Sequence, residues 1–202
     1  MEPRDHASDE ALMSAYQAGD AEAFEELVRR YLAEVHAFLA RFVGDRTLAE
    51  DLCQETFLQV HLSAASFDAS QRLRPWLFTI AANKARDRLR RAGRRPVQSL
   101  DGAIDAGEPD ATRFVDLMVS DEATPPANVQ AEEAREAVRR IIETMPPAYR
   151  EVLLLSYFHN FSYEQIARIV EVPVGTVKSR LHAAVGHFAQ RWKRRQADAG
   201  GE

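Results

Sequence analysis

Apolar residues recur at intervals of three and four along most of the chain, which is the spacing of amphipathic helices. In the first half this pattern predicts helices over 9–18, from 20 to a stop at Gly44, from Thr47 onward, and over 75–91. The strict alternation that marks half-buried β-strands does not occur in this half. The hydrophobic pattern therefore predicts helices and no sheet.

Residues at the ends of these helices supply the expected boundaries. Asp20 can accept hydrogen bonds from the first turn of the second helix, and Gly44 ends that helix. The run Thr47-Leu-Ala-Glu50 has the form of a capping box, in which a hydroxyl and a carboxylate satisfy the first N–H groups reciprocally. Pro75 suits the first turn of the fourth helix because its φ is already helical, which leaves 66–74 as a loop.

The helical pattern is interrupted in the middle of the chain. From Val97 to Glu133 glycine and proline break the periodicity, and nine carboxylates face a single arginine, Arg113. Such a composition cannot bury much apolar surface. We therefore predict an acidic, flexible linker over 96–130.

Helical pattern resumes near Ala131, and the last two predicted helices have the form of a helix-turn-helix. A capping box at Ser162-Tyr-Glu-Gln165 begins one of them, and Glu171-Val-Pro173 is the break before the other. The last helix has an apolar stripe formed by Val174, Val177, Leu181, Val185 and Phe188. Its opposite face carries the small residues Gly175, Ser179, Ala183 and Gly186. This pattern is typical of DNA-binding helices, although an ordinary solvated face explains the spacing alone equally well.

The distribution of charge along the chain favours a nucleic-acid partner, whereas the negative net charge argues against one. The formal net charge is −5, yet the chain has no carboxylate from Thr176 to Ala197. A second basic segment runs from Lys84 to Arg95, opposed only by Asp87. Since a mean charge hides local patches, both segments are candidates for contact with phosphates.

Composition and motifs also limit the class of protein. A lone cysteine, Cys53, excludes an internal disulfide framework, and the chain shows neither a signal peptide nor an apolar run long enough to span a bilayer. We therefore expect a cytoplasmic protein without membrane insertion. The chain has no glycine-rich phosphate loop, and its histidines lack metal-ligand spacing. No catalytic residue, metal, cofactor or small-molecule substrate is expected.

Trp76 lies on the polar side of the fourth predicted helix, with Asn83 on the same side. Two interpretations remain open. The indole can pack against the loop 66–74, because large aromatics usually find cover. Alternatively, it forms a stacking surface for an unpaired base, with Asn83 reading a base edge and the nearby arginines holding phosphates.

In their order and spacing these motifs resemble bacterial RNA polymerase sigma factors of the extracytoplasmic-function group (group IV). The motifs are Asp51-x-x-Gln54-Glu55-x-Phe57, Pro75-Trp76-Leu77-Phe78 with Ile80-Ala81 and Asn83, Pro146-Pro147-x-x-Arg150-Glu151-Val152, Ser162-Tyr163-x-x-Ile166-Ala167, and Val174-Gly175-Thr176-Val177-Lys178-Ser179-Arg180-Leu181-His182. The resemblance extends from about Asp9 to Trp192. It implies an all-α chain with a region-two bundle over 9–95 and a region-four helix-turn-helix over 131–195.

The resemblance also implies partners and roles for individual residues. An alternative sigma factor binds core RNA polymerase, directs it to promoter DNA, and is held inactive by an anti-sigma factor. Polymerase contact is then expected at Asp51, Gln54 and Glu55, for which ordinary surface charge is the alternative. Minus-ten recognition is expected from Arg72, Arg74, Trp76, Asn83, Lys84, Arg86, Asp87 and Arg90. Minus-thirty-five recognition in the major groove is expected from Thr176, Lys178, Ser179, Arg180 and His182.

Two alternatives of other classes stay open at this point. One is a helix-turn-helix regulator that binds operators without polymerase. The other is a helical interaction protein that contacts polymerase without melting promoters. Start-site-specific initiation by core polymerase distinguishes a sigma factor from both.

The chain departs from the family in the turn before the last helix, which reads Val170-Glu171-Val172 where Leu-Gly-Val is frequent. Glu171 then occupies a position that favours glycine, and a small strain is expected there.

A second departure follows His182, where Arg-Ala-Arg is common and this sequence has Ala183-Ala184-Val185. We hypothesise weaker intrinsic minus-thirty-five binding, with more reliance on the basic run 191–195. Ala183→Arg should then tighten binding to a minus-thirty-five duplex and steepen the dependence of log K on log salt by about one. Anisotropy titrations at several salt concentrations measure both quantities, and an unchanged affinity and slope would contradict the hypothesis.

Overall fold

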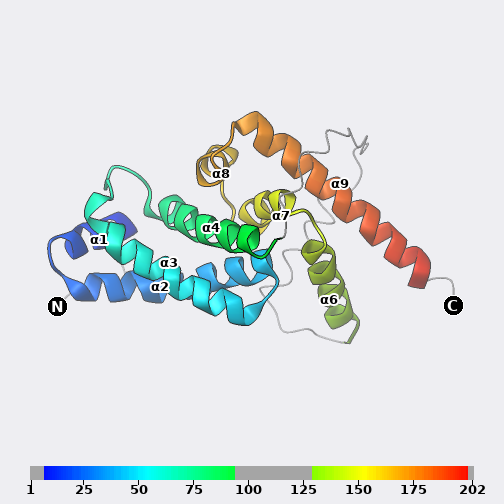
Figure 1. Ribbon diagram of the computed structural model, residues 1–202, viewed down its shortest axis with the longest axis horizontal. Coiled ribbons are helices and arrows are strands. Elements are labelled where there is room, and N and C mark those ends of the chain that lie inside the picture. The colour runs from blue at the N-terminus through cyan, green and yellow to red at the C-terminus, as the bar shows by residue number, and fades with distance from the viewer. Residues whose placement is uncertain (1–6, 94–128, 200–202) are drawn as a thin grey trace. The chain divides into compact units, whose positions relative to one another are not determined.

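The computed structural model describes residues 7–93 and 129–199, and the regular elements within these ranges are all helical (Figure 1). The predicted all-α fold is confirmed. The chain forms two compact units, the first made mainly of the helices before residue 94 and the second mainly of those after 128. The predicted linker, 96–130, lies outside the described residues except for its last two positions, which begin α6.

The first unit is a helical bundle. Its elements are α1 (Asp9–Gln17), α2 (Ala21–Val43), α3 (Arg46–Ser63), the 3-10 turn η2 (Ala64–Ser66) and α4 (Leu73–Arg91). The long helix α2 packs against α1, α3 and α4. At the centre, the ring of Phe38 lies 5.6 Å from that of Phe42 and 5.4 Å from that of Phe78, and all three side chains are fully buried. These aromatic contacts join α2 to α4 and so position the helix that carries Trp76.

Most helix ends in this unit follow the expected capping signals. Ser8 Oγ accepts a hydrogen bond from Ala11 N at 3.2 Å, and Asp20 Oδ1 accepts one from Glu22 N at 3.1 Å. Gly44 ends α2 with a φ of 72°, which suits a residue without Cβ. The predicted roles of Asp20 and Gly44 are therefore confirmed.

The predicted capping box at Thr47-Leu-Ala-Glu50 is wrong. Helix α3 begins at Arg46, and Asp45 Oδ1 accepts the hydrogen bond from Leu48 N at 3.0 Å. The left-handed turn at Gly44 delivers Asp45 in an extended conformation, with φ −144° and ψ 119°. That conformation aims a carboxylate at the first-turn N–H groups, so Asp45 occupies the N-cap before Thr47 is reached.

Helix α4 begins at Leu73, two residues before Pro75, so the predicted loop 66–74 shortens to 67–72. Pro75 still lies in the first turn, where its missing N–H would have had no intrahelical partner. The helix continues to Arg91, as predicted, and Gly93 follows with a φ of 70°.

The second unit contains the predicted helix-turn-helix. Its elements are α6 (Val129–Glu143), α7 (Pro147–Leu153), the π-helical turn η3 (Leu154–Phe158), α8 (Tyr163–Val170) and α9 (Val174–Ala199). Helix α9 packs against α6 and α7. The core of this second unit includes the buried side chains of Val138, Ile142, Val152, Leu153, Ile166, Val177, Leu181 and Phe188.

The Pro-Pro motif between α6 and α7 leads into a buried arginine. Arg150 Nη2 donates to Met145 O at 2.9 Å and also to Glu143 O. Carbonyl groups at the end of a helix lack intrahelical partners, and a cationic donor satisfies them. Arg150 therefore closes the end of α6 and sets the start of α7.

Two local signals define the helix-turn-helix. The capping box at Ser162 is confirmed, since Ser162 Oγ accepts from Gln165 N at 3.3 Å and Gln165 Oε1 accepts from Ser162 N at 2.8 Å. After Val170 the chain turns through Glu171, which has a φ of 56° and a ψ of 46°. A left-handed conformation favours glycine, so the small strain expected at Glu171 is present.

We expect Asp45→Ala to lower the free energy of unfolding of the first unit by about 1 kcal/mol, because Leu48 N–H loses its acceptor. Thr47→Ala is the matched control and should change it by less than about 0.5 kcal/mol. Urea unfolding followed by Trp76 fluorescence in a Trp192→Phe background measures both. A greater loss for Thr47→Ala than for Asp45→Ala would show that the cap is misassigned.

We expect Glu171→Gly to stabilise the turn between α8 and α9 by about 1 kcal/mol, because relief of left-handed strain exceeds the added entropy of the unfolded chain. Glu171→Ala keeps the Cβ and should give no such gain. Hydrogen–deuterium exchange at the amides of α8 and α9 measures the difference. Equal protection in the two variants would rule out backbone strain as the cause.

Candidate functional site

The loop 67–72 and the start of α4 form the first part of the site. Phe67 and Leu73 are buried at the two ends of the loop, while 68–72 are exposed. Trp76 is half-buried, and its ring lies 4.9 Å from that of Phe67 at an interplanar angle of 54°. The indole thus packs against the loop, as the first interpretation expected, and still leaves part of its surface accessible to a ligand.

Polar residues continue along α4 beyond Trp76. Arg86 Nη2 donates to Asn83 Oδ1, which turns the Asn83 carbonyl toward the arginine. Asp87 and Arg90 are exposed and form an ion pair of 3.0 Å between Oδ1 and Nη1. Because residues three, four and seven apart share a helix face, these four side chains extend the surface that begins at Trp76.

The remaining cations predicted for this surface have different environments. Arg72 has a side chain that is 81% exposed, so its guanidinium is accessible. Arg74 instead forms an ion pair with Glu34 of α2 and lies 5.5 Å from the centre of the Phe78 ring. Lys84 Nζ lies 3.7 Å from Glu55 Oε2 of α3. Arg72 is thus presented to solvent, whereas Arg74 is held by side chains of the bundle.

A second surface runs along α3. Asp51, Gln54 and Glu55 are exposed, as expected for a contact surface. Leu58 and Leu62 are 58% and 67% exposed and lie on the same side, because they follow Asp51 by seven and eleven residues. We name these five residues the α3 stripe. The two leucines were not among the residues predicted for this surface, although their positions outside the buried pattern of α3 were a usable signal.

The third surface is the first half of α9. Lys178, Ser179 and His182 are exposed, and Thr176 and Arg180 are half-buried. The ammonium of Lys178 lies 6.0 Å from the centre of the Tyr163 ring, at the start of α8. A cation over an aromatic face is weakly attracted by it, so Tyr163 restrains the direction of the lysine side chain.

The predicted faces of α9 need two corrections. Ala184 is buried beside Val177, Leu181 and Phe188, whereas Val174 and Val185 are only half-buried. Gly186 is buried too, so the small exposed face is shorter than expected. Farther along, burial and the neighbouring Arg191 lower the pKa of His187, which favours the neutral imidazole.

Other kinds of site find no support in the described residues. Among them, no three His, Cys, Asp or Glu side chains are arranged to hold a metal ion. No described helix has the length and hydrophobicity required to cross a membrane. Cys53 is buried, burial raises the pKa of its thiol, and its Sγ lies 4.0 Å from Leu32 O. Such a thiol is poorly reactive.

Comparisons with known proteins match both units. The Sigma-70 region 2 family model matches residues 27–95, and the Sigma-70 region 4 model matches residues 135–188. The RNA polymerase sigma-H factor of Pseudomonas aeruginosa is 34% identical over 87% of this chain and 89% of its own length. The ECF RNA polymerase sigma-E factor of Escherichia coli is 36% identical, over 88% of this chain and 90% of its own.

Solved structures agree with these matches. The sigma factor RpoE of Bartonella quintana, solved in complex with the anti-sigma factor NepR, is 26% identical with a TM-score of 0.63. The match covers 86% of this chain and 98% of that one. CnrH, solved with the cytosolic domain of CnrY, shares the fold with a TM-score of 0.62, 23% identity and coverage of 92% and 97%. The resemblance found in the sequence is confirmed: the chain belongs to the extracytoplasmic-function family of RNA polymerase sigma factors, which are transcription initiation factors.

Proposed function

We propose that this sigma factor binds core RNA polymerase through the α3 stripe, reads the minus-ten element with the loop 67–72 and α4, and reads the minus-thirty-five element with α9. The observation that carries the proposal is Trp76, a large aromatic side chain that packs against Phe67 and yet remains partly exposed. It lies at the start of a face that also bears Asn83 and Arg90. Stacking and hydrogen-bonding groups on one face are what capture of an unpaired base requires.

Capture of a base is favoured by the environment of Trp76. Stacking of a base on an aromatic side chain contributes about 1–3 kcal/mol, which offsets part of the stacking lost when the duplex opens. Asn83, oriented by Arg86, supplies an amide for a base edge. Arg72 and Arg90 are exposed beside this face and can contact phosphates. Arg74 serves this surface indirectly, by joining α4 to Glu34 of α2.

The α3 stripe combines carboxylates with exposed leucines, which suits a protein partner better than DNA. Leu58 and Leu62 supply apolar area to the centre of an interface, and Asp51 and Glu55 supply charge at its rim. A DNA duplex would be repelled by these carboxylates. We therefore assign core polymerase to this surface and extend the predicted contact, Asp51, Gln54 and Glu55, to Leu58 and Leu62.

Helix α9 is suited to the major groove of a duplex. Lys178, Ser179 and His182 are exposed donors on a helix that follows a tight turn, and Arg180 lies beside them. The exposed cations Arg191, Lys193, Arg194 and Arg195 follow on the same helix. They can contact phosphates and so contribute affinity without sequence specificity.

The assignment of regions follows from these roles. We assign minus-ten recognition and polymerase binding to region two over 9–95, minus-thirty-five recognition to region four over 131–195, and the connection to the linker 96–130. The protein is not an enzyme in this proposal, because polymerase performs the chemistry. It acts in the cytoplasm, where polymerase and promoter DNA are found. An anti-sigma factor is a further expected partner, since RpoE of Bartonella quintana was solved with one.

An operator-binding regulator is the less favoured alternative. Such a regulator needs only the second unit, whereas the family matches cover both units. It would also leave the exposed leucines and carboxylates of the α3 stripe without a role.

The test is transcription by core polymerase on promoter fragments, with and without this protein. We expect start-site-specific initiation only when the protein is present. Trp76→Ala should lower the yield of open complex at least about fivefold, because a base loses its stacking partner. Trp76→Phe keeps an aromatic ring and should lower the yield of open complex much less. Potassium permanganate footprinting of unpaired thymines measures this yield. Full promoter opening by Trp76→Ala, at unchanged polymerase affinity, would refute the assigned role.

A further inference from the structure

The exposed part of the loop 67–72 forms a turn with hydrogen bonds of its own. Asp68 Oδ1 accepts a hydrogen bond from Ser70 N at 2.9 Å, and Asp68 O accepts one from Gln71 N at 2.9 Å. The bond from Ser70 N–H lowers the pKa of the Asp68 carboxyl. The residues 68–72 are therefore a folded turn between two buried anchors, Phe67 and Leu73.

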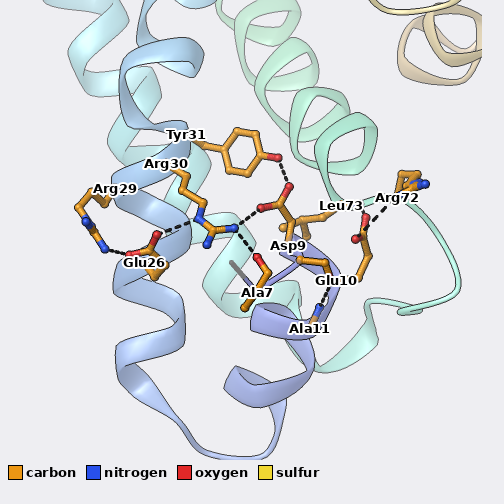
Figure 2. A network of polar contacts seen from close by, with 11 residues as sticks. Ala7, Asp9, Glu10, Ala11, Glu26, Arg29, Arg30, Tyr31, Arg72 and Leu73 are labelled. Atoms are coloured by element: carbon orange, nitrogen blue, oxygen red, sulfur yellow. Dashed lines mark hydrogen bonds and ion pairs between the residues drawn. The ribbon is translucent and has the colours of Figure 1, made fainter. Parts of the chain in front are cut away.

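Helix α1 contacts the backbone at both anchors of this loop. At one end, Gln17 Nε2 donates to Phe67 O at 2.9 Å and to Ala64 O, in the turn η2, at 2.8 Å. At the other end, Glu10 Oε1 accepts from Leu73 N at 3.1 Å, as Figure 2 shows. The two contacts come from side chains seven residues apart, which lie on the same side of one helix.

Glu10 also provides the N-terminal capping bond that the residues next to α4 in the chain do not make. The residue at the N-cap of α4 is Arg72, which makes no side-chain capping bond. The Glu10 carboxylate takes this role from another helix, bringing an acceptor and a negative charge to the first turn of α4. Its Oε2 also lies 3.9 Å from Arg72 Nη1, and this ion pair adds little energy because the Arg72 side chain is exposed to solvent (Figure 2).

Helix α1 is itself held firmly on α2, so it can serve as a fixed support. Asp9 accepts hydrogen bonds from Tyr31 Oη and from Arg30 Nη1, the latter at 3.0 Å (Figure 2). Arg30 also donates to Ala7 O and to the buried Glu26, each at 2.8 Å. Burial and the bond to Asp9 raise the pKa of Tyr31, so the phenol stays a donor.

We propose that α1 is a clamp for the minus-ten loop, in which Gln17 and Glu10 are positioning residues that hold its two ends. By fixing Phe67 and the first turn of α4, the clamp fixes the ring pair of Phe67 and Trp76. A base-capturing surface held in advance loses less entropy on binding. This inference rests on the proposed role of Trp76, and it gives a function to a helix that precedes the matched segment 27–95.

The test uses holoenzyme reconstituted from core polymerase and full-length variants. Its probe is a forked promoter fragment whose minus-ten non-template strand is single-stranded. Glu10→Ala and Gln17→Ala should each weaken binding of this probe about fivefold, the effect of losing about one hydrogen bond of average strength. Affinity for core polymerase should be unchanged. Glu10→Gln keeps an acceptor for Leu73 N–H and should restore most of the binding.

Matched controls separate a clamp from general support of the fold. Glu25→Ala removes an exposed carboxylate of α2 and should leave the probe affinity unchanged. Melting curves of each free variant identify any loss of folded protein. If the melting temperature of Glu10→Ala is too low for the protein to stay folded in the binding assay, the Gln17→Ala variant alone provides the test.

The outcomes distinguish the clamp from the function on which it rests. Probe affinity at the wild-type level in Glu10→Ala and Gln17→Ala, with a loss in Trp76→Ala, overturns the clamp and leaves the proposed function standing. An equal loss of probe and polymerase affinity also overturns it, since the residues would then only support the fold. Unchanged probe affinity in Trp76→Ala overturns both proposals.

Discussion

Burial of α2 along most of its length holds the first unit together. Its apolar stripe contacts α1, α3 and α4, and Phe38, Phe42 and Phe78 close the centre. Each buried aromatic or aliphatic side chain contributes about 1.5–3 kcal/mol. Each helix around α2 contacts it with only one face. The opposite faces of α3 and α4 are therefore available for exposed leucines, carboxylates and arginines. The proposed interfaces occupy those outer faces.

Ion pairs and hydrogen bonds have a different role in this unit. The Asp87–Arg90 pair is exposed and the Lys84–Glu55 pair is partly exposed, and ion pairs in contact with solvent contribute little to stability. They do restrict the directions of long side chains that would otherwise sample many rotamers. The bonds from Arg86 to Asn83 and from α1 to the loop ends act in the same way. Polar contacts thus orient groups on a scaffold that apolar burial stabilises.

Charge is divided along the chain in a way that the net value conceals. The formal net charge is −5, yet the segments that form the proposed DNA surfaces are rich in cations. Charges more than about 10 Å apart are largely screened in physiological salt, so a phosphate responds mainly to the nearest side chains. Local cations can therefore attract DNA while the whole chain remains acidic.

Signals that act within one or two helical turns were readable from the sequence alone. The helices, the stop at Gly44, the capping box at Ser162 and the strained turn at Glu171 depend on neighbours in the chain, and all were predicted. The ordered motifs also indicated the family that the comparisons confirmed. Contacts between distant residues were not readable. Glu10 caps α4 across 63 residues and Gln17 reaches Ala64 across 47, and only packed helices bring these atoms within bonding distance. The choice of Asp45 over Thr47 was local but missed, because the left-handed turn at Gly44 sets the conformation of Asp45. The pairing of Arg74 with Glu34 was decided by packing, because it depends on where the axis of α4 lies relative to that of α2.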